Sequence, residues 1–239
     1  MTKPDALMAY LFDGKPHPLS GSLSQWAEAS PRFTLFAETY RDKIRKKIRA
    51  ARQPDRLLDL RSELEVAFCL LSDRRLALAY EPYASKKRRG PDFTVTYRLN
   101  LTFNLEVARL HTGENGQEDA VDLPSLERPV LRILLDKLGQ MQPSMPNLLV
   151  VRTGDELARR IDLGGLMQQV KTRAEAKDPA FYALSRYTSP SAFFKDYLRL
   201  SAILLWSDDV QPWVNKQARP GLEEKLLRLV SAAARSCRR

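Results

Sequence analysis

The chain has 239 residues, a net charge of +10, a hydrophobic fraction of 44% and a charged fraction of 28%. This length allows one substantial core, and the composition excludes a fibrous or disordered chain. The longest apolar stretches, such as Leu200–Trp206, are far shorter than the roughly 20 residues of a membrane-spanning helix, and Met1–Phe12 lacks the regions of a signal peptide. We therefore expect a single cytoplasmic domain with no membrane partner, and the basic charge favours a polyanionic partner.

Cysteines and histidines are too few for the sites usually built from them. Cys69 lies in an apolar helical run and Cys237 lies beside the C-terminus, a pattern that predicts neither a disulfide framework nor a zinc site. His17 and His111 are the two histidines. A hydrolase of the Ser-His-Asp type is therefore not expected.

The spacing of apolar residues predicts helices and strands in alternation. Helices are expected at 32–52, 57–71, 125–140, 164–177 and 191–198, and from Pro220 to about Ala234. Strands are expected at 76–83, in two arms within 89–110, at 147–151 and at 200–206. Thr153 and Glu156 have the spacing of a capping box, which predicts the start of one more helix.

This order of elements predicts an α/β domain in which helices flank a mixed β-sheet. Residues 55–152, with the order helix, three strands, helix and strand, are expected to form the core. Residues 1–54 are expected to be an N-terminal helical extension, and residues 153–239 a C-terminal α/β completion. We expect all three parts to belong to one domain.

The predicted hairpin alternates apolar and polar side chains, and this alternation sets its register. Opposed residues of an antiparallel pair point to the same face, so apolar residues must pair with apolar residues. A loop centred on Leu99 satisfies this condition, since it pairs Phe93 with Leu105 and Val95 with Phe103.

The same register places two carboxylates opposite one another. Asp92 pairs with Glu106, at a Cβ separation of about 4.5–5.5 Å. Two carboxylates at this distance repel each other unless a cation lies between them. A divalent metal would resolve the conflict, because Mg²⁺ prefers carboxylate oxygens and keeps water and phosphate as its other ligands. The alternative is a solvated face on which Arg98 or Arg109 neutralises the acids.

A third acid lies on the predicted helix at 57–71. Glu63 is three residues after Leu60 and four before Ala67, so it projects within the apolar stripe of that helix. A buried acid is costly without a partner, and a metal-bound water or a basic neighbour would supply one. We therefore expect Glu63 to face the sheet near the other two acids.

Basic residues gather in two places. The segment 41–52 contains seven Lys or Arg against one acid, Asp42, and the loop before the hairpin contains four in succession. These four loop residues are Lys86, Lys87, Arg88 and Arg89. Phosphate contacts by Lys and Arg dominate nucleic-acid affinity, so we expect the loop to bind a nucleic-acid backbone. A solvated face is the alternative for the helix.

The acids and their surroundings resemble the PD-(D/E)xK nuclease superfamily, which has the restriction-endonuclease-like fold. The resemblance is found in Glu63 within SELEVAFCLL, in Asp92 within GPDFTV and in Glu106 within FNLEVA. The later segments Leu200–Trp206 and Trp213–Leu222 are also similar to bacterial members. The resemblance implies that Asp92 and Glu106 bind Mg²⁺ or Mn²⁺, with Glu63 as an auxiliary ligand or orienting group.

One position departs from the family pattern. The family lysine, two residues after the strand glutamate, is replaced by Ala108. Another basic residue would have to help position and activate the attacking water. The candidates are Arg109, Lys86, Lys87, Arg132 and Lys137.

Three functions are compatible with these patterns. The first is metal-dependent hydrolysis of nucleic acid, with DNA as the expected substrate, by catalytic residues Glu63, Asp92 and Glu106. The second, favoured by Ala108, is a catalytically inactive relative that retains binding. The third is an interaction protein whose basic helix contacts an acidic protein or membrane surface.

Overall fold

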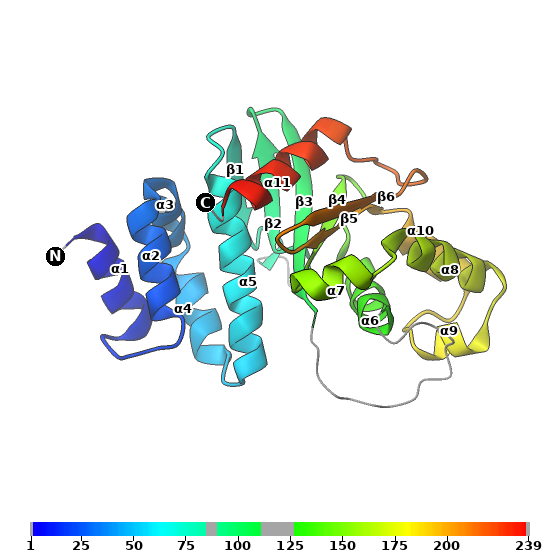
Figure 1. Ribbon diagram of the computed structural model, residues 1–239, viewed down its shortest axis with the longest axis horizontal. Coiled ribbons are helices and arrows are strands. Elements are labelled where there is room, and N and C mark those ends of the chain that lie inside the picture. Colours follow the sequence, from blue (N-terminus) through cyan, green and yellow to red (C-terminus); the bar gives the residue numbers. More distant parts are fainter. Residues whose placement is uncertain (1, 85–89, 111–126, 238–239) are drawn as a thin grey trace.

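A computed structural model describes residues 2–84, 90–110 and 127–237 (Figure 1). The helices are α1 (Lys3–Phe12), α2 (Ser20–Ala29), α3 (Pro31–Thr39), α4 (Arg41–Ala50), α5 (Pro54–Leu71), α6 (Arg128–Lys137), α7 (Asp155–Arg160), α8 (Leu163–Glu175), α9 (Pro179–Ala183), α10 (Pro190–Tyr197) and α11 (Glu224–Ser236), with a short 3-10 turn at Leu138–Gln140. The strands are β1 (Leu76–Tyr80), β2 (Phe93–Tyr97), β3 (Leu101–Arg109), β4 (Asn147–Arg152), β5 (Leu200–Trp206) and β6 (Val210–Val214).

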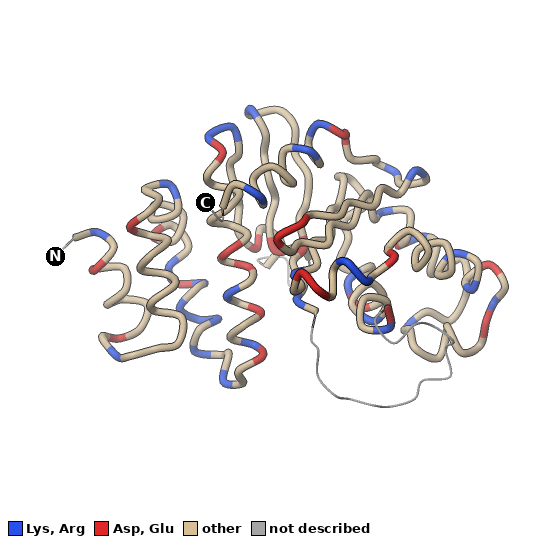
Figure 2. Tube along the Cα trace, viewed as in Figure 1, with Lys and Arg blue, Asp and Glu red and all other residues tan. Residues whose placement is uncertain are grey.

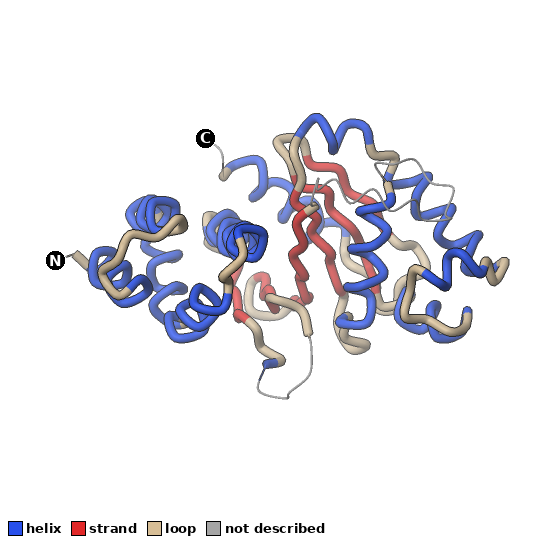
Figure 3. Tube along the Cα trace, turned by 90° about the horizontal axis from the view of Figure 1, so that it is seen from below, coloured by secondary structure: helices blue, strands red, loops and turns tan. Residues whose placement is uncertain are grey.

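The strands form one six-stranded mixed sheet in the order β1-β2-β3-β4-β5-β6. Strands β1, β2 and β3 pair antiparallel, β3, β4 and β5 pair parallel, and β6 returns antiparallel to β5. Helices lie on both sides of the strand layer (Figure 3). The predicted α/β architecture, a mixed sheet flanked by helices, is therefore confirmed.

The hairpin of β2 and β3 has the predicted register. Phe93 pairs with Leu105 and Val95 with Phe103. Leu99 lies at the turn with a φ of 71° and is 94% exposed, as a residue at the tip of a loop should be. The match of apolar to apolar side chains across the pair is therefore sufficient to set this register.

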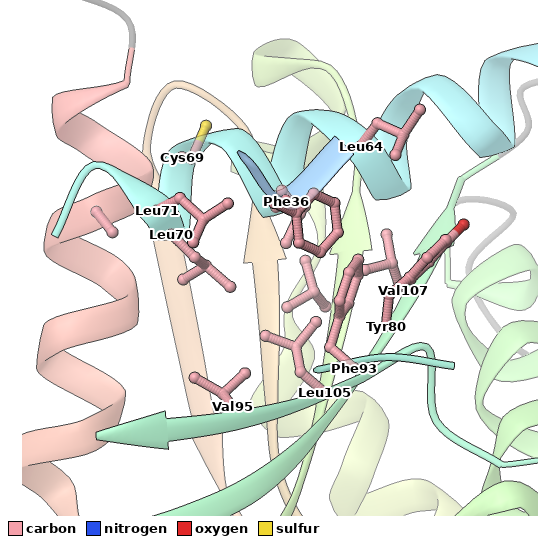
Figure 4. Packing of buried hydrophobic residues seen from close by; sticks show 14 of the residues in the cluster. Phe36, Leu64, Cys69, Leu70, Leu71, Tyr80, Phe93, Val95, Leu105 and Val107 are labelled. Atoms are coloured by element: carbon pink, nitrogen blue, oxygen red, sulfur yellow. The ribbon is translucent and has the colours of Figure 1, made fainter. Parts of the chain in front are cut away.

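Each face of the sheet has its own apolar layer. The N-terminal helices, α5 and α11 cover the first face, where Val95, Leu105 and Val107 lie beneath Leu64 and Leu70 of α5 (Figure 4). Helices α6, α8, α9 and α10 cover the second face. Strands β4 and β5 are apolar on both sides because they lie between these two layers.

Three predictions about elements need correction. The helix expected over 32–52 is divided at Tyr40, whose φ of −108° and ψ of 17° are not helical, into α3 and α4. Thr153 does not cap a helix, since the N-cap of α7 is Gly154. Strand β6 was not predicted, because Pro212 interrupts a short segment with weak alternation.

A disulfide joins Cys69 of α5 to Cys237, the C-cap residue of α11. The expectation that the two cysteines form no such link was wrong, because residues 168 positions apart meet where α11 packs on α5. Disulfides are most common in oxidising compartments, so this link does not support the cytoplasmic prediction, which stays a prediction. Among the described residues, no helix is long and apolar enough to cross a membrane.

Candidate active site

Asp92 and Glu106 lie side by side at the end of the hairpin and are bonded to each other's strand. The backbone N–H of Asp92 donates to Oε2 of Glu106 at 3.1 Å, and the N–H of Val107 donates to Oδ2 of Asp92 at 2.9 Å. Glu106 is 2% exposed. The two carboxylates expected from the register are therefore held together in a buried place.

Glu63 of α5 reaches the same region and has two partners. Nζ of Lys47, on α4, lies 2.7 Å from Oε2 of Glu63, and the hydroxyl of Tyr80 donates to the same oxygen at 2.9 Å. Lys47 also lies 2.9 Å from Oε1 of Glu81. Of the two possible partners of Glu63, a metal-bound water or a basic neighbour, the N-terminal helical extension provides the basic neighbour, although none of the predicted site residues lies in that part of the chain.

Lys137 of α6 lies at the acid pair. Its Nζ donates to Oε1 of Glu106 at 2.7 Å. Arg109 instead bonds to Asp55 and Asp59 of α5. Among the candidate substitutes for a lysine at Ala108 that lie in the described residues, Lys137 is therefore the one with a bond to the acid pair. Lys86 and Lys87 lie outside the described residues.

Burial and mutual repulsion weaken the acidity of all three carboxyl groups. Burial, together with the charge of Glu106, raises the pKa of Asp92 to about 7. Burial, together with the charge of Asp92, raises the pKa of Glu63 to about 7 despite the nearby Lys47. Burial also raises the pKa of Glu106, and the charge of Lys137 opposes this rise. The three acids thus share an environment that favours an added positive charge.

A cleft of about 520 Å³ opens over the acid pair. Its walls come from α4, from the start of α5, from the segments flanking β1 and β2, and from α6. They include Lys47, Arg56, Glu81, Tyr83, Asp92, Glu106, Asp136, Lys137 and Gln140. The predicted site residues Asp92 and Glu106 therefore line this cleft, while Glu63 borders two smaller hollows.

The donor atoms are of the kind that Mg²⁺ or Mn²⁺ takes. Oδ1 of Asp92 accepts no hydrogen bond from any described residue, although the side chain lines the cleft. Mg²⁺ is commonly bound by one or two carboxylates, with water and phosphate as its other ligands. Asp92 and Glu106 fit this pattern. Within the described ranges, no three His, Cys, Asp or Glu side chains are grouped closely enough to hold a metal ion together.

The basic residues of α4 have separate roles. Lys and Arg positions follow one another along this helix beside α5 (Figure 2). Arg45 and Arg49 bond to Asp13, and Lys43 donates to the carbonyl oxygens of Tyr80 and Glu81. These contacts fix the helix to its neighbours. The predicted nucleic-acid-binding residues Lys86, Lys87, Arg88 and Arg89 lie outside the described residues.

A scan of protein-family models finds no match to this chain, and searches among curated proteins and solved structures also find none.

Proposed function

We propose that the protein is a metal-dependent, nuclease-like enzyme that hydrolyses phosphodiester bonds of nucleic acid, with DNA as the expected substrate. The observation that carries this proposal is the pair of carboxylates, half-buried Asp92 and buried Glu106, at an open cleft with Lys137 bonded to one of them. Paired hard donors next to a fixed ammonium group suit the binding and hydrolysis of a phosphodiester.

The order of elements supports the resemblance to the PD-(D/E)xK superfamily. Helix α5, strands β1 to β3, helix α6 and strand β4 follow one another as in the restriction-endonuclease-like core. Lys137 supplies a basic group that Ala108 lacks, and it does so from the helix that follows the strand with Glu106. We therefore propose the restriction-endonuclease-like fold for this sheet and its helices.

Each site residue has a distinct part in the proposed reaction. Asp92 and Glu106 would hold Mg²⁺ or Mn²⁺, which supplies Lewis-acid stabilisation of phosphate charge when bound. Lys137 orients Glu106 and adds positive charge beside the place where a phosphate would lie. Glu63, held by Lys47 and Tyr80, acts as the auxiliary acid that can bind and orient a water molecule.

The test combines calorimetry with cleavage on the same samples. Wild type and Asp92→Ala/Glu106→Ala are titrated with Mn²⁺ and Mg²⁺, and labelled DNA and RNA are followed for cleavage. We expect wild type to bind the metal and cleave, and the double variant to do neither. Absence of metal binding and of cleavage in a folded wild-type protein would refute the proposal.

A second candidate function is binding without cleavage. It is favoured by the contacts of Glu106, whose two oxygens are already occupied by Lys137 and by the N–H of Asp92. A protein of this kind would bind nucleic acid in a salt-sensitive manner and leave it intact in Mn²⁺. The same experiment separates the two candidates, because only the enzyme produces shortened strands.

A further inference from the structure

Three hollows beside the acids share lining residues. The main cleft and a hollow of about 240 Å³ at the junction of α4 and α5 share Lys47 and Arg56. A third hollow, of about 430 Å³, shares Glu63 with the second and Lys137 with the first. We call these three together the acid groove. Its lining residues include Arg56, the three acids and Lys137 of α6.

Arg56 and Lys47 stand on one wall of this groove. Arg56, near the start of α5, is exposed and makes no hydrogen bond or ion pair with any described residue. Lys47 is 28% exposed and directs two of its three N–H groups to Glu63 and Glu81. The guanidinium of Arg56 is thus available to an anion in the groove, and the ammonium group of Lys47, which also lies 4.9 Å from the ring centroid of Tyr80, adds positive charge to the same wall.

The chemistry of the walls selects the phosphate backbone rather than the bases. Tyr83 is the one aromatic side chain among the described residues that line the acid groove, so no platform for stacked bases is present there. Arg and Lys contacts to phosphate position a nucleic acid without reading its sequence. The groove therefore fits a sugar-phosphate backbone bound without regard to sequence.

The charge of the groove is close to balanced. Its described walls hold six carboxylates and five basic groups. The carboxylates are Asp59, Glu63, Glu81, Asp92, Glu106 and Asp136, and the basic groups are Lys47, Arg56, Arg109, Arg132 and Lys137. A polyanion is therefore not attracted by the groove as a whole. It is held where a basic group has N–H donors to spare, and a divalent cation at the acids strengthens the attraction.

We infer that α4 of the N-terminal helical extension and the start of α5 form a substrate-binding wall, on which Lys47 and Arg56 hold backbone phosphates of a nucleic acid that lies across Asp92 and Glu106. This inference rests on the proposed function, since it takes the acid groove to be the place where the phosphodiester lies. The extension is then part of the site as well as a support for α5.

The test measures binding separately from cleavage. A short fluorescein-labelled DNA duplex, and an RNA duplex of the same sequence, are titrated by anisotropy in Ca²⁺ at several salt concentrations between about 50 and 200 mM. The variants are Arg56→Ala and Lys47→Met. Arg235→Ala is the matched control, because Arg235 is exposed on α11 and lines a separate hollow beside β6. Cleavage in Mn²⁺ is measured for every protein.

We expect Arg56→Ala and Lys47→Met each to weaken binding by up to about five-fold at low salt. Each should also reduce the slope of log affinity against log salt concentration by about one, while Arg235→Ala behaves as wild type. The duplex that binds more tightly identifies the preferred backbone. Replacing Ca²⁺ with EDTA should weaken wild-type binding.

Equal affinities and salt slopes for wild type, Arg56→Ala and Lys47→Met would overturn the inference, as would an Arg235→Ala effect as large as theirs. Cleavage by wild type together with that result would leave the proposed function standing. Binding that depends on Arg56, without any cleavage, would instead refute the enzymatic proposal and support the inferred binding wall. No binding of either duplex by folded wild type would overturn the inference outright.

Discussion

Helix α5 has different chemistry at its two ends. Its N-terminal part directs Asp59 and Glu63 towards the acid groove, where Arg109 and Lys47 bond to them. Its last six residues, Val66–Leu71, are apolar, and this part is fully buried at Leu70 and is linked by Cys69 to the end of α11. The acids at one end cost stability, and the packing and disulfide at the other end offset that cost.

This difference indicates how the site keeps its geometry. Buried carboxylates with raised pKa values favour conformations that let water in. A helix anchored by apolar contacts along its second half resists such opening, because moving Glu63 would also displace the side chains that cover β2 and β3 (Figure 4). Changes at the first end should therefore alter activity, and changes at the second end should alter stability.

The largest expected effect is on catalysis. Lys137→Met should lower kcat/KM for cleavage by at least about 100-fold, because it removes the ammonium group beside Glu106. Lys171→Met is the matched control, since Lys171 forms a long ion pair on α8. Partial recovery in Lys137→Arg would separate loss of charge from loss of structure. Wild-type rates in Lys137→Met would contradict the assigned part of this lysine.

At the apolar end, Cys237→Ser should lower the free energy of unfolding by about 2–5 kcal/mol. The disulfide closes a loop of 168 residues, and its loss frees the unfolded chain. For a chain of this size the change corresponds to a fall in Tm of roughly 4–20 °C by calorimetry. Cleavage at 25 °C should stay within about two-fold of wild type. If Cys237→Ser left Tm unchanged but impaired cleavage, the apolar end of α5 would affect activity and not stability, contrary to this comparison.

The stability of the acid centre should depend on pH in a defined direction. Burial raises the pKa of Asp92 from 3.8 to about 7, so the folded protein retains a proton that the unfolded chain releases. Stability in EDTA should therefore fall as pH rises from about 4 to 7. Asp92→Asn removes this contribution, so its advantage in unfolding free energy over wild type should be near zero at pH 4 and largest at pH 8.

Asp13 provides the opposite case for this pH measurement. A hydrogen bond from Arg49 lowers the pKa of the exposed Asp13, so any stabilisation by this acid is present above its normal pKa and is lost on acidification. Asp13→Asn should therefore lower the free energy of unfolding slightly at pH 8 and should leave it unchanged at pH 2. If the difference in unfolding free energy between Asp92→Asn and wild type changed with pH in the same direction as for Asp13→Asn, burial would not raise the pKa of Asp92.

A smaller effect is expected at Tyr80. Tyr80→Phe removes the hydroxyl that donates to Glu63 and should cost about 1.5–3 kcal/mol in urea unfolding at a pH above the raised pKa of Glu63, where the acceptor is charged. Tyr182→Phe removes a hydroxyl bound to a neutral carbonyl, that of Ala174, and should cost about 0.5–1.5 kcal/mol. Equal losses in the two variants would mean that Glu63 is protonated in the folded protein at the pH used.

The alternation and spacing of neighbouring side chains were sufficient to predict several features of the fold and the site. Alternation in the two arms of the hairpin was enough for its register, because a shift of one residue would expose Phe93 and Val95. The same register placed Asp92 beside Glu106, and helical spacing directed Glu63 inward. These features depend on neighbours in the chain or on one strand pair, so periodicity is sufficient to predict them.

Tertiary structure alone decided which distant groups meet the acids. Lys47 and Lys137 belong to helices on either side of the sheet, and nothing in their local sequence distinguishes them from other surface lysines. The meeting of Cys69 with Cys237 likewise depends on how α11 crosses α5. Contacts between residues far apart in the chain follow from the packing of whole elements, whereas register and helical face follow from the order of neighbouring side chains.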